Sequence, residues 1–150
     1  MKLKIAQVAP LWFSIPPKKY GGTERIVHFL SEELVKRGHK VTLFASGDSK
    51  TKAKLVAPVK KGLIEQGIPW SDYTWSGFNT FLAFKKADRF DIIHAHWGLF
   101  SFFFQEFVKT PVLFTFHNIP KRGDHRWKIM EYFKNKINVV FISHSEKNNS

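Results

Sequence analysis

The sequence predicts an α/β fold, a Rossmann-like three-layer sandwich built on a mostly parallel sheet. Short apolar runs alternate with helical patterns along the chain, and this alternation is typical of βαβ units with right-handed crossovers. With 43% hydrophobic and 16% aromatic residues, the chain has the composition of a globular protein. Its 150 residues suffice for one domain that buries most of its apolar surface.

Strands and helices are expected in regular succession. The strands are expected at residues 3–9, 40–46, 54–59, 90–96, 111–117 and 137–143. The helices are expected between Gly22 and Gly38 and at residues 73–87, 99–108 and 124–136, the last one capped by Asp124. Because Pro58 has no backbone N–H to donate, the strand at 54–59 is expected at an edge of the sheet.

Two of these helices have a predicted inward face. In the first helix, apolar residues recur at three- and four-residue spacing, so the residues expected in the core are Ile26, Phe29, Leu30, Leu34 and Val35. This spacing places Glu24 on the solvent side. Ion pairs one turn apart are expected between Glu32 and Lys36 and between Glu33 and Arg37. In the helix at 73–87, the residues expected to point inward are Trp75, Phe78, Phe81 and Leu82.

Composition narrows the environment of the protein. No cysteine is present, which excludes disulfides and thiolate metal sites. No apolar run approaches the roughly 20 residues that a membrane span needs, and the first residues lack the apolar core of a signal peptide. We therefore expect a soluble, cytoplasmic protein, with peripheral contact at the inner membrane face as an alternative.

The chain carries a net charge of +12, from 24 Lys and Arg against 12 Asp and Glu. Such an excess attracts anions: phosphorylated substrates, nucleic acid or anionic lipid. The positive charge is concentrated at residues 50–61 and 121–136, and solvated loops and helix faces explain these clusters equally well. Because the sequence contains no recognised nucleic-acid-binding module, nucleic acid is not among the predicted partners.

Four stretches lie beyond the ends of predicted strands and should meet at one edge of the sheet. They are residues 20–22, 46–48, 94–97 and 117–118. Ligands of open parallel sheets bind at the carboxyl ends of the strands. Gly21 and Gly22 also precede the first helix, whose N-terminus offers unpaired N–H groups to an anion. Their spacing matches neither the dinucleotide-binding motif nor the P-loop, so simple turn formation is the alternative.

Three histidines are candidates for chemistry. His94 and His96 lie two apart on a strand, so their side chains should point to one face, and a structural role is the alternative for them. No metal site is predicted there, because no further ligand lies nearby in the sequence. His117 ends a strand beside Asn118, where a neutral imidazole can hydrogen-bond a hydroxyl or accept a proton, with strand-end capping as the alternative. The absence of a G-x-S-x-G motif and of cysteine argues against a covalent hydrolase.

Several stretches together resemble the opening of family four glycosyltransferases, which are two-domain enzymes of the GT-B fold. The segments that carry this resemblance are residues 16–24, 34–39, 41–49, 90–97, 114–120 and 139–146. Residues 90–97 are similar to the D-x-x-H-x-H strand of that family and of glycogen and starch synthases. Residues 114–120 are similar to its T-x-H-N segment. The order and spacing match across nearly the whole chain.

The resemblance implies retaining transfer of a sugar from a nucleotide-sugar, with UDP, GDP or ADP as the nucleotide, to a hydroxyl acceptor. It implies that His117 is the catalytic residue, lying at the reacting centre against the donor sugar. The residues implied in binding the donor phosphate or the acceptor are Gly21, Gly22, Thr23, Glu24, His96 and Asn118. No metal ion and no cofactor is expected, because the nucleotide-sugar is itself a substrate.

The resemblance also has a limit. Family members place most donor contacts in a C-terminal domain, including an Arg/Lys pair and an E-x7-E segment, and residues 1–150 are expected to end before that domain. We therefore expect an incomplete N-terminal, acceptor-side domain that is inactive alone and needs the C-terminal domain or a partner chain. The alternative is a non-catalytic module that binds a sugar phosphate, a glycolipid or an anionic membrane surface.

Overall fold

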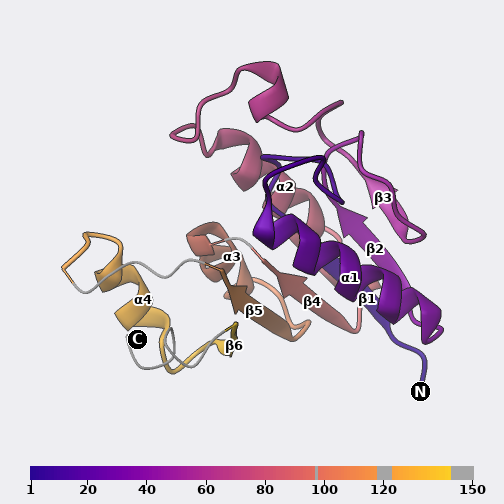
Figure 1. Cartoon of the computed structure of the whole chain (residues 1–150). Helices are drawn as coiled ribbons and strands as arrows, with labels where there is room; N and C mark the ends of the chain where they lie inside the picture. Colours follow the sequence, from indigo (N-terminus) through magenta and orange to yellow (C-terminus); the bar gives the residue numbers. More distant parts are fainter. Residues whose placement is uncertain (97, 118–122, 143–150) are drawn as a thin grey trace.

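The computed structural model describes residues 1–96, 98–117 and 123–142, and its centre is a six-stranded sheet (Figure 1). In spatial order the strands are β3 (Lys54–Val56), β2 (Lys40–Phe44), β1 (Lys4–Val8), β4 (Ile92–Ala95), β5 (Val112–Phe116) and β6 (Asn138–Phe141). Every neighbouring pair in this sheet is parallel. The strand order changes direction at β1, which makes the carboxyl edge between β1 and β4 a place for a ligand. The edge position predicted for β3 is confirmed.

Helices cover both faces of the sheet, which confirms the predicted three-layer α/β fold (Figure 1). The helical elements are α1 (Gly22–Lys36), α2 (Thr74–Phe84), α3 (Gly98–Gln105), α4 (Trp127–Phe133) and two short turns, η1 (Ile64–Gln66) and η2 (Ala87–Arg89). On one face, Val27 of α1 shares a core with Leu43 of β2. On the other face, Ala83 of α2 and Phe102 of α3 share a core with Ile93 of β4. No helix in the described parts of the chain is long and apolar enough to cross a membrane.

Helix α1 is rotated relative to the prediction. Val27 and Ser31 are fully buried, whereas Phe29 is 70% exposed and Ile26 is 39% exposed. Glu24, expected on the solvent side, is only 3% exposed. In its first half the inward face therefore follows the spacing of Glu24, Val27 and Ser31. The predicted core positions of Leu34 and Val35, nearer the end of the helix, are confirmed by their packing against the cluster that contains Val27.

Only one of the two ion pairs predicted on α1 is present. Glu33 binds Arg37 at 2.9 Å, as expected, and Lys36 also contacts Glu33, at 3.8 Å. The predicted Glu32–Lys36 pair is wrong, because Glu32 instead accepts hydrogen bonds from the Thr51 hydroxyl and the Lys52 backbone N–H. These bonds attach α1 to the chain that leads into β3.

Helix α2 turns a largely different side to the sheet than predicted, and of the four residues expected inward only Leu82 packs against the core. Its buried residues are Ser76, Asn79, Thr80, Ala83 and Phe84, and the exposed ones include Trp75, Phe78 and Phe81. The reason is a need for hydrogen bonds: the Asn79 amide donates to the carbonyls of Ala9 (3.0 Å) and Phe44 (3.1 Å). Small side chains also let the helix lie close to the sheet. The predicted inward orientation of Trp75, Phe78 and Phe81 is therefore wrong.

Helix α4 is shorter than predicted, and Asp124 does not cap it. The Asp124 carboxylate accepts a hydrogen bond from the Arg126 backbone N–H at 2.8 Å and contacts the guanidinium of the same residue. This local turn precedes the helix, which begins at Trp127. The Arg126 hydrogen bonds hold the pKa of Asp124 well below its usual range.

Candidate active site

An open cavity of about 830 Å³ lies at the carboxyl edge of the sheet. Its wall includes the first turn of α1 and the ends of β4 and β5. The predicted site residues that line it are Gly22, Thr23, Glu24, His96 and His117. Gly21 lies beside this group without lining the cavity, and Asn118 is outside the described residues. The fold thus brings together side chains that are nearly a hundred positions apart in the sequence.

The two glycines have different roles. Gly21 has a φ of 137°, and a Cβ there would lie 2.8 Å from Pro17 and 2.9 Å from the Glu24 carboxylate. Its conformation and its close contacts therefore require glycine for local packing. A Cβ on Gly22 would meet nothing within 4 Å, and Gly22 lines the cavity. The backbone at the start of α1 can consequently be approached closely by a ligand, which would meet the positive end of the helix.

Glu24 lies in the same first turn with its side chain buried in the cavity wall. Among the described residues, the only hydrogen bond to its carboxylate comes from its own backbone N–H, and no cation pairs with it. Burial therefore raises its pKa to about 7. A carboxyl group in this position carries a partial charge at neutral pH and has acceptor capacity to spare.

A chain of hydrogen bonds crosses the sheet beneath the cavity. The Gln7 side chain of β1 lies 2.6 Å from His96 Nε2, and His96 Nδ1 lies 3.2 Å from His117 Nε2. Next to this chain, His94 Nε2 lies 2.7 Å from the Thr115 hydroxyl. The rings of His94 and His96 have centroids 4.1 Å apart, which confirms that both side chains lie on one face.

Burial keeps all three histidines uncharged at neutral pH. It lowers the pKa of His117 to about 4 and, with a smaller effect from His117, that of His94 to about 4. The pKa of His96 lies well below its ordinary value, first because of burial and then because of its two neighbours. In the structure His117 lies next to His94 and His96, for which the sequence showed no third ligand nearby. The described residues nevertheless form no group of three ligands arranged for a metal ion.

Aromatic side chains form much of the remaining wall. The Trp12 and Trp70 rings have centroids 4.9 Å apart, and Phe13 lies edge-on to Trp70 at 5.6 Å. All three line the cavity, together with Tyr20 and Tyr73. Tyr20 belongs to residues 20–22, which were expected at this edge of the sheet. The other four rings were not predicted as site residues, although Trp12 and Phe13 follow the first strand at its carboxyl end and could have been identified from that position.

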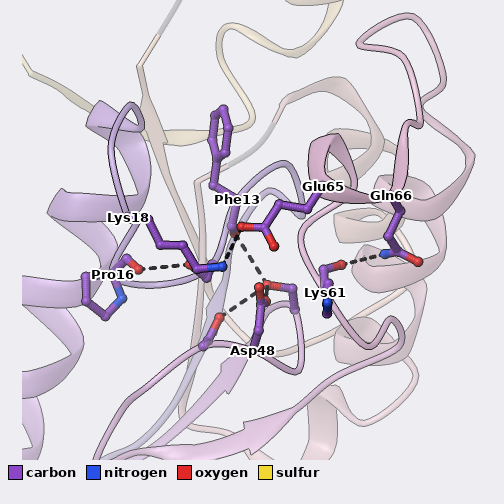
Figure 2. A network of polar contacts seen from close by, with 10 residues as sticks. Phe13, Pro16, Lys18, Asp48, Lys61, Glu65 and Gln66 are labelled. Atoms are coloured by element: carbon purple, nitrogen blue, oxygen red, sulfur yellow. Dashed lines mark hydrogen bonds and ion pairs between the residues drawn. The ribbon is translucent and has the colours of Figure 1, made fainter.

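The loop that carries Trp12 and Phe13 is held by polar contacts to two neighbouring segments (Figure 2). Lys18 binds Glu65 of η1 at 2.8 Å. The Ser46 hydroxyl donates to Asp48 at 2.6 Å and contacts the Phe13 carbonyl at 3.4 Å. Residues 46–48, expected at the shared rim, thus support the loop and do not line the cavity.

Gly62 completes the attachment of this loop. A Cβ on Gly62 would lie 2.9 Å from both the Phe13 Cα and the Trp12 carbonyl oxygen. This close approach allows the Leu63 backbone N–H to donate to the carbonyl of Leu11 at 2.9 Å. The loop that carries Trp12 and Phe13 is therefore held in place by the backbone of Gly62 and Leu63.

Comparison with known proteins agrees with this architecture. The family model described as Glycosyltransferase Family 4 matches residues 20–149. Among solved structures, the chain is similar to AviGT4, a glycosyltransferase involved in avilamycin A biosynthesis, with 24% identity, a TM-score of 0.50 and 79% of this chain covered. The chain spans 33% of AviGT4, about a third of its length, and this likeness concerns the fold alone. A search of curated proteins gave no match. On the family match, which covers most of its length, the chain belongs to glycosyltransferase family 4.

Proposed function

We propose that this chain is the acceptor-side domain of an enzyme that moves a sugar from a nucleotide-sugar to a hydroxyl group with retention of configuration. One observation carries the proposal: the cavity has the N-terminus of α1 and the neutral His117 in a single wall. Membership of a glycosyltransferase family supports the reaction class. The retaining outcome and the nucleotide rest on the resemblance of the sequence motifs.

In the proposed reaction, the first turn of α1 stabilises the leaving diphosphate. Backbone N–H groups of Gly22 and Thr23 are at the positive end of a fifteen-residue helix and border the cavity. Donors that are already oriented toward a developing negative charge need no reorganisation during the reaction, which is why they lower its barrier. No metal ion or cofactor takes part, and the nucleotide-sugar is a substrate.

His117 contacts the donor sugar in this proposal. Its Nε2 is occupied by His96, so Nδ1 is the ring atom available to a sugar hydroxyl. Because burial keeps the ring uncharged, His117 acts through hydrogen bonding and not as a cation. His96 has the role of a positioning residue for the His117 ring, and Asn118 is proposed to bind beside it.

The whole reaction is proposed for this domain together with a donor-binding domain, supplied by the same polypeptide or by a partner chain. The chain covers only about a third of AviGT4. We propose that residues 1–150 alone turn over no sugar donor, and measurable transfer by this purified chain would refute that statement.

Calorimetric titration with UDP, UDP-glucose, GDP-mannose and ADP-glucose tests the donor part. We expect weak binding that Gly22→Val reduces by about tenfold or more, because the valine side chain fills the space where a phosphate would meet the backbone. Gly77→Ala is the control, since its Cβ would make only ordinary contacts with Phe100. Binding that Gly22→Val leaves unchanged would contradict the phosphate position. No binding by the folded chain would place the whole donor site elsewhere.

A second candidate function is recognition of an anionic surface or sugar phosphate without catalysis. It is favoured by a separate cavity of about 300 Å³ at the other end of the strands. The cationic residues that line it are Lys4, Lys40, Lys54, Lys86 and Arg89, and no carboxylate is among its lining residues. Such a group of like charges attracts an anion, and a cytoplasmic location at the inner membrane face would supply one in the form of acidic lipid.

A further inference from the structure

Glu24 is unusual because it is a carboxyl group in the cavity wall, 3% exposed, with no cation beside it among the described residues. A buried charge without a partner costs folding free energy. The Oε2 atom also lies next to Gly21, so the side chain is folded back toward the first turn of its own helix. A group held in this way has free acceptor positions that a ligand in the cavity can use.

The charge of Glu24 argues against a phosphate as its neighbour. A carboxylate and a phosphate oxygen repel each other strongly in a poorly solvated site, and no cation pairs with Glu24 among the described residues. Arg126 also lines the cavity, but its guanidinium is paired with Asp124. A hydroxyl group has the opposite effect, because it donates a hydrogen bond to the carboxylate and compensates its lost hydration. Glu24 therefore fits a hydroxyl-bearing ligand.

The aromatic wall adds a second requirement. Trp12 is buried, but Trp70 is 50% exposed and Tyr73 is 40% exposed, and all three line the same cavity as Glu24. Aromatic faces of this size stack on rings and pack against hydrocarbon, but they do not attract an anion, because the face of the ring is itself negative. The ligand that matches both features is uncharged, hydroxylated and ring-shaped or apolar over part of its surface.

We propose that Glu24 and the Trp12, Trp70 and Tyr73 rings form the acceptor subsite of the cavity. The acceptor is an uncharged molecule that donates a hydroxyl hydrogen bond to Glu24 and packs a ring or hydrocarbon face on the aromatic wall. This inference rests on the proposed function. Glu24 then binds the acceptor, whereas Gly22, two residues earlier, binds the donor phosphate. The first turn of α1 thus contacts both substrates.

The test uses phenyl β-glucoside as the probe, because it combines hydroxyl groups with an aromatic ring. Binding is followed by ¹⁵N–¹H spectra of the whole chain at about pH 8, above the pKa of Glu24. We expect shifts of the Trp12 and Trp70 indole signals and of residues 22–26, with saturation at millimolar concentration. Glu24→Gln should weaken binding a few-fold, because a neutral acceptor replaces a charged one, and Glu24→Ala by about tenfold.

Glu33→Gln is the matched control, since Glu33 lies on the same helix but points to solvent, where it pairs with Arg37. It should leave the affinity for the probe unchanged. The amide spectrum shows whether each variant is folded. A saturable response that is the same in all variants would overturn the proposal, and so would the absence of any response in the folded native chain.

A parallel titration with UDP separates this inference from the donor site. We expect the UDP affinity to change less than twofold in Glu24→Gln, because the carboxylate faces the acceptor and not the phosphates. An increase of about fivefold or more would mean that Glu24 repels a neighbouring phosphate, and the acceptor assignment would be wrong. If UDP does not bind but the probe binds in a Glu24-dependent way, the acceptor subsite stands and the donor position fails.

Discussion

At the scale of single residues, the buried Glu24 carboxyl makes the stability of the protein depend on pH. Its pKa is about 7 in the folded state, against 4.5 as the ordinary value. The folded state therefore holds the proton more tightly than the unfolded state, so this group favours folding fully below pH 4.5. That contribution is lost as pH rises toward 7 and beyond.

We expect Glu24→Gln to stabilise the protein by up to about 3 kcal/mol at pH 8 and by almost nothing at pH 4. The reason is that glutamine never carries the charge that burial penalises. Urea unfolding of both proteins across this pH range measures the difference. His94 and His117, whose pKa values are lowered, act in the opposite direction at acid pH, but they are present in both proteins and cancel. A stability difference that does not vary with pH would contradict the burial of an uncompensated carboxyl.

Some of these residues could be identified from the sequence and some could not. The shared face of His94 and His96 follows from the two-residue period of a strand, so it was predictable. The contact of His96 with Gln7 spans 89 positions and depends on which strands become neighbours. The burial of Glu24 was missed because the phase of α1 was assigned from its apolar residues, and Phe29 is in fact exposed.

At the scale of elements, α2 shows a helix whose orientation is determined by hydrogen bonding. The Asn79 amide serves two carbonyl groups, at the end of β2 and just after β1, that would otherwise lose a donor. We expect Asn79→Ala to lower the free energy of unfolding by about 1–3 kcal/mol, since the Ala9 carbonyl loses this donor and the Phe44 carbonyl keeps only the Ala9 backbone N–H. Urea unfolding at neutral pH measures this loss.

Phe78→Gln is the control for that prediction, one position away on the same helix. Because Phe78 is 44% exposed, the substitution should cost less than about 1 kcal/mol. The orientation predicted from hydrophobicity gives the opposite ranking, with Phe78 more costly than Asn79. If the measured losses followed that ranking, the orientation of α2 in the structure would be wrong.

The strands were more predictable than the helix faces. All six occur within their expected segments. Strands of a parallel sheet are buried on both faces, so they are recognisable in the sequence as short apolar runs between helices. The orientation of a helix cannot be predicted from its own segment alone, because it also depends on groups elsewhere in the fold. For α2 these groups are carbonyls at the ends of distant strands. The same limit explains why Asp124 was predicted as a cap: its carboxylate bonds the nearer Arg126 backbone N–H before the helix begins.

At the scale of the whole molecule, parallel topology explains why a cavity could be expected before its residues were known. In such a sheet the carboxyl ends of all strands face one edge, and the strand order changes direction at β1. The glycine pair and the histidines were therefore expected at the same edge. The aromatic wall was not predicted, because it depends on how the loops after β1 and β3 pack on each other through Gly62.

The net charge of +12 gives a last prediction, which concerns the basic cavity at the opposite edge. If an anionic surface binds there, the location of the charge matters and not only its amount. We expect the chain to sediment with vesicles that contain acidic phospholipid at low salt and to be released at high salt, where screening shortens the range of attraction. Neutral vesicles should not retain it.

A pair of triple variants separates location from amount. Lys54→Gln, Lys86→Gln and Arg89→Gln together remove three charges from the basic cavity. Lys109→Gln, Lys128→Gln and Lys134→Gln remove the same charge from exposed positions outside it. With roughly 1 kcal/mol expected for each cation near an acidic surface, the first variant should lose about a hundredfold in vesicle affinity and the second much less. Equal losses would show that the vesicles respond only to net charge, and the basic cavity would then have no role as a binding site.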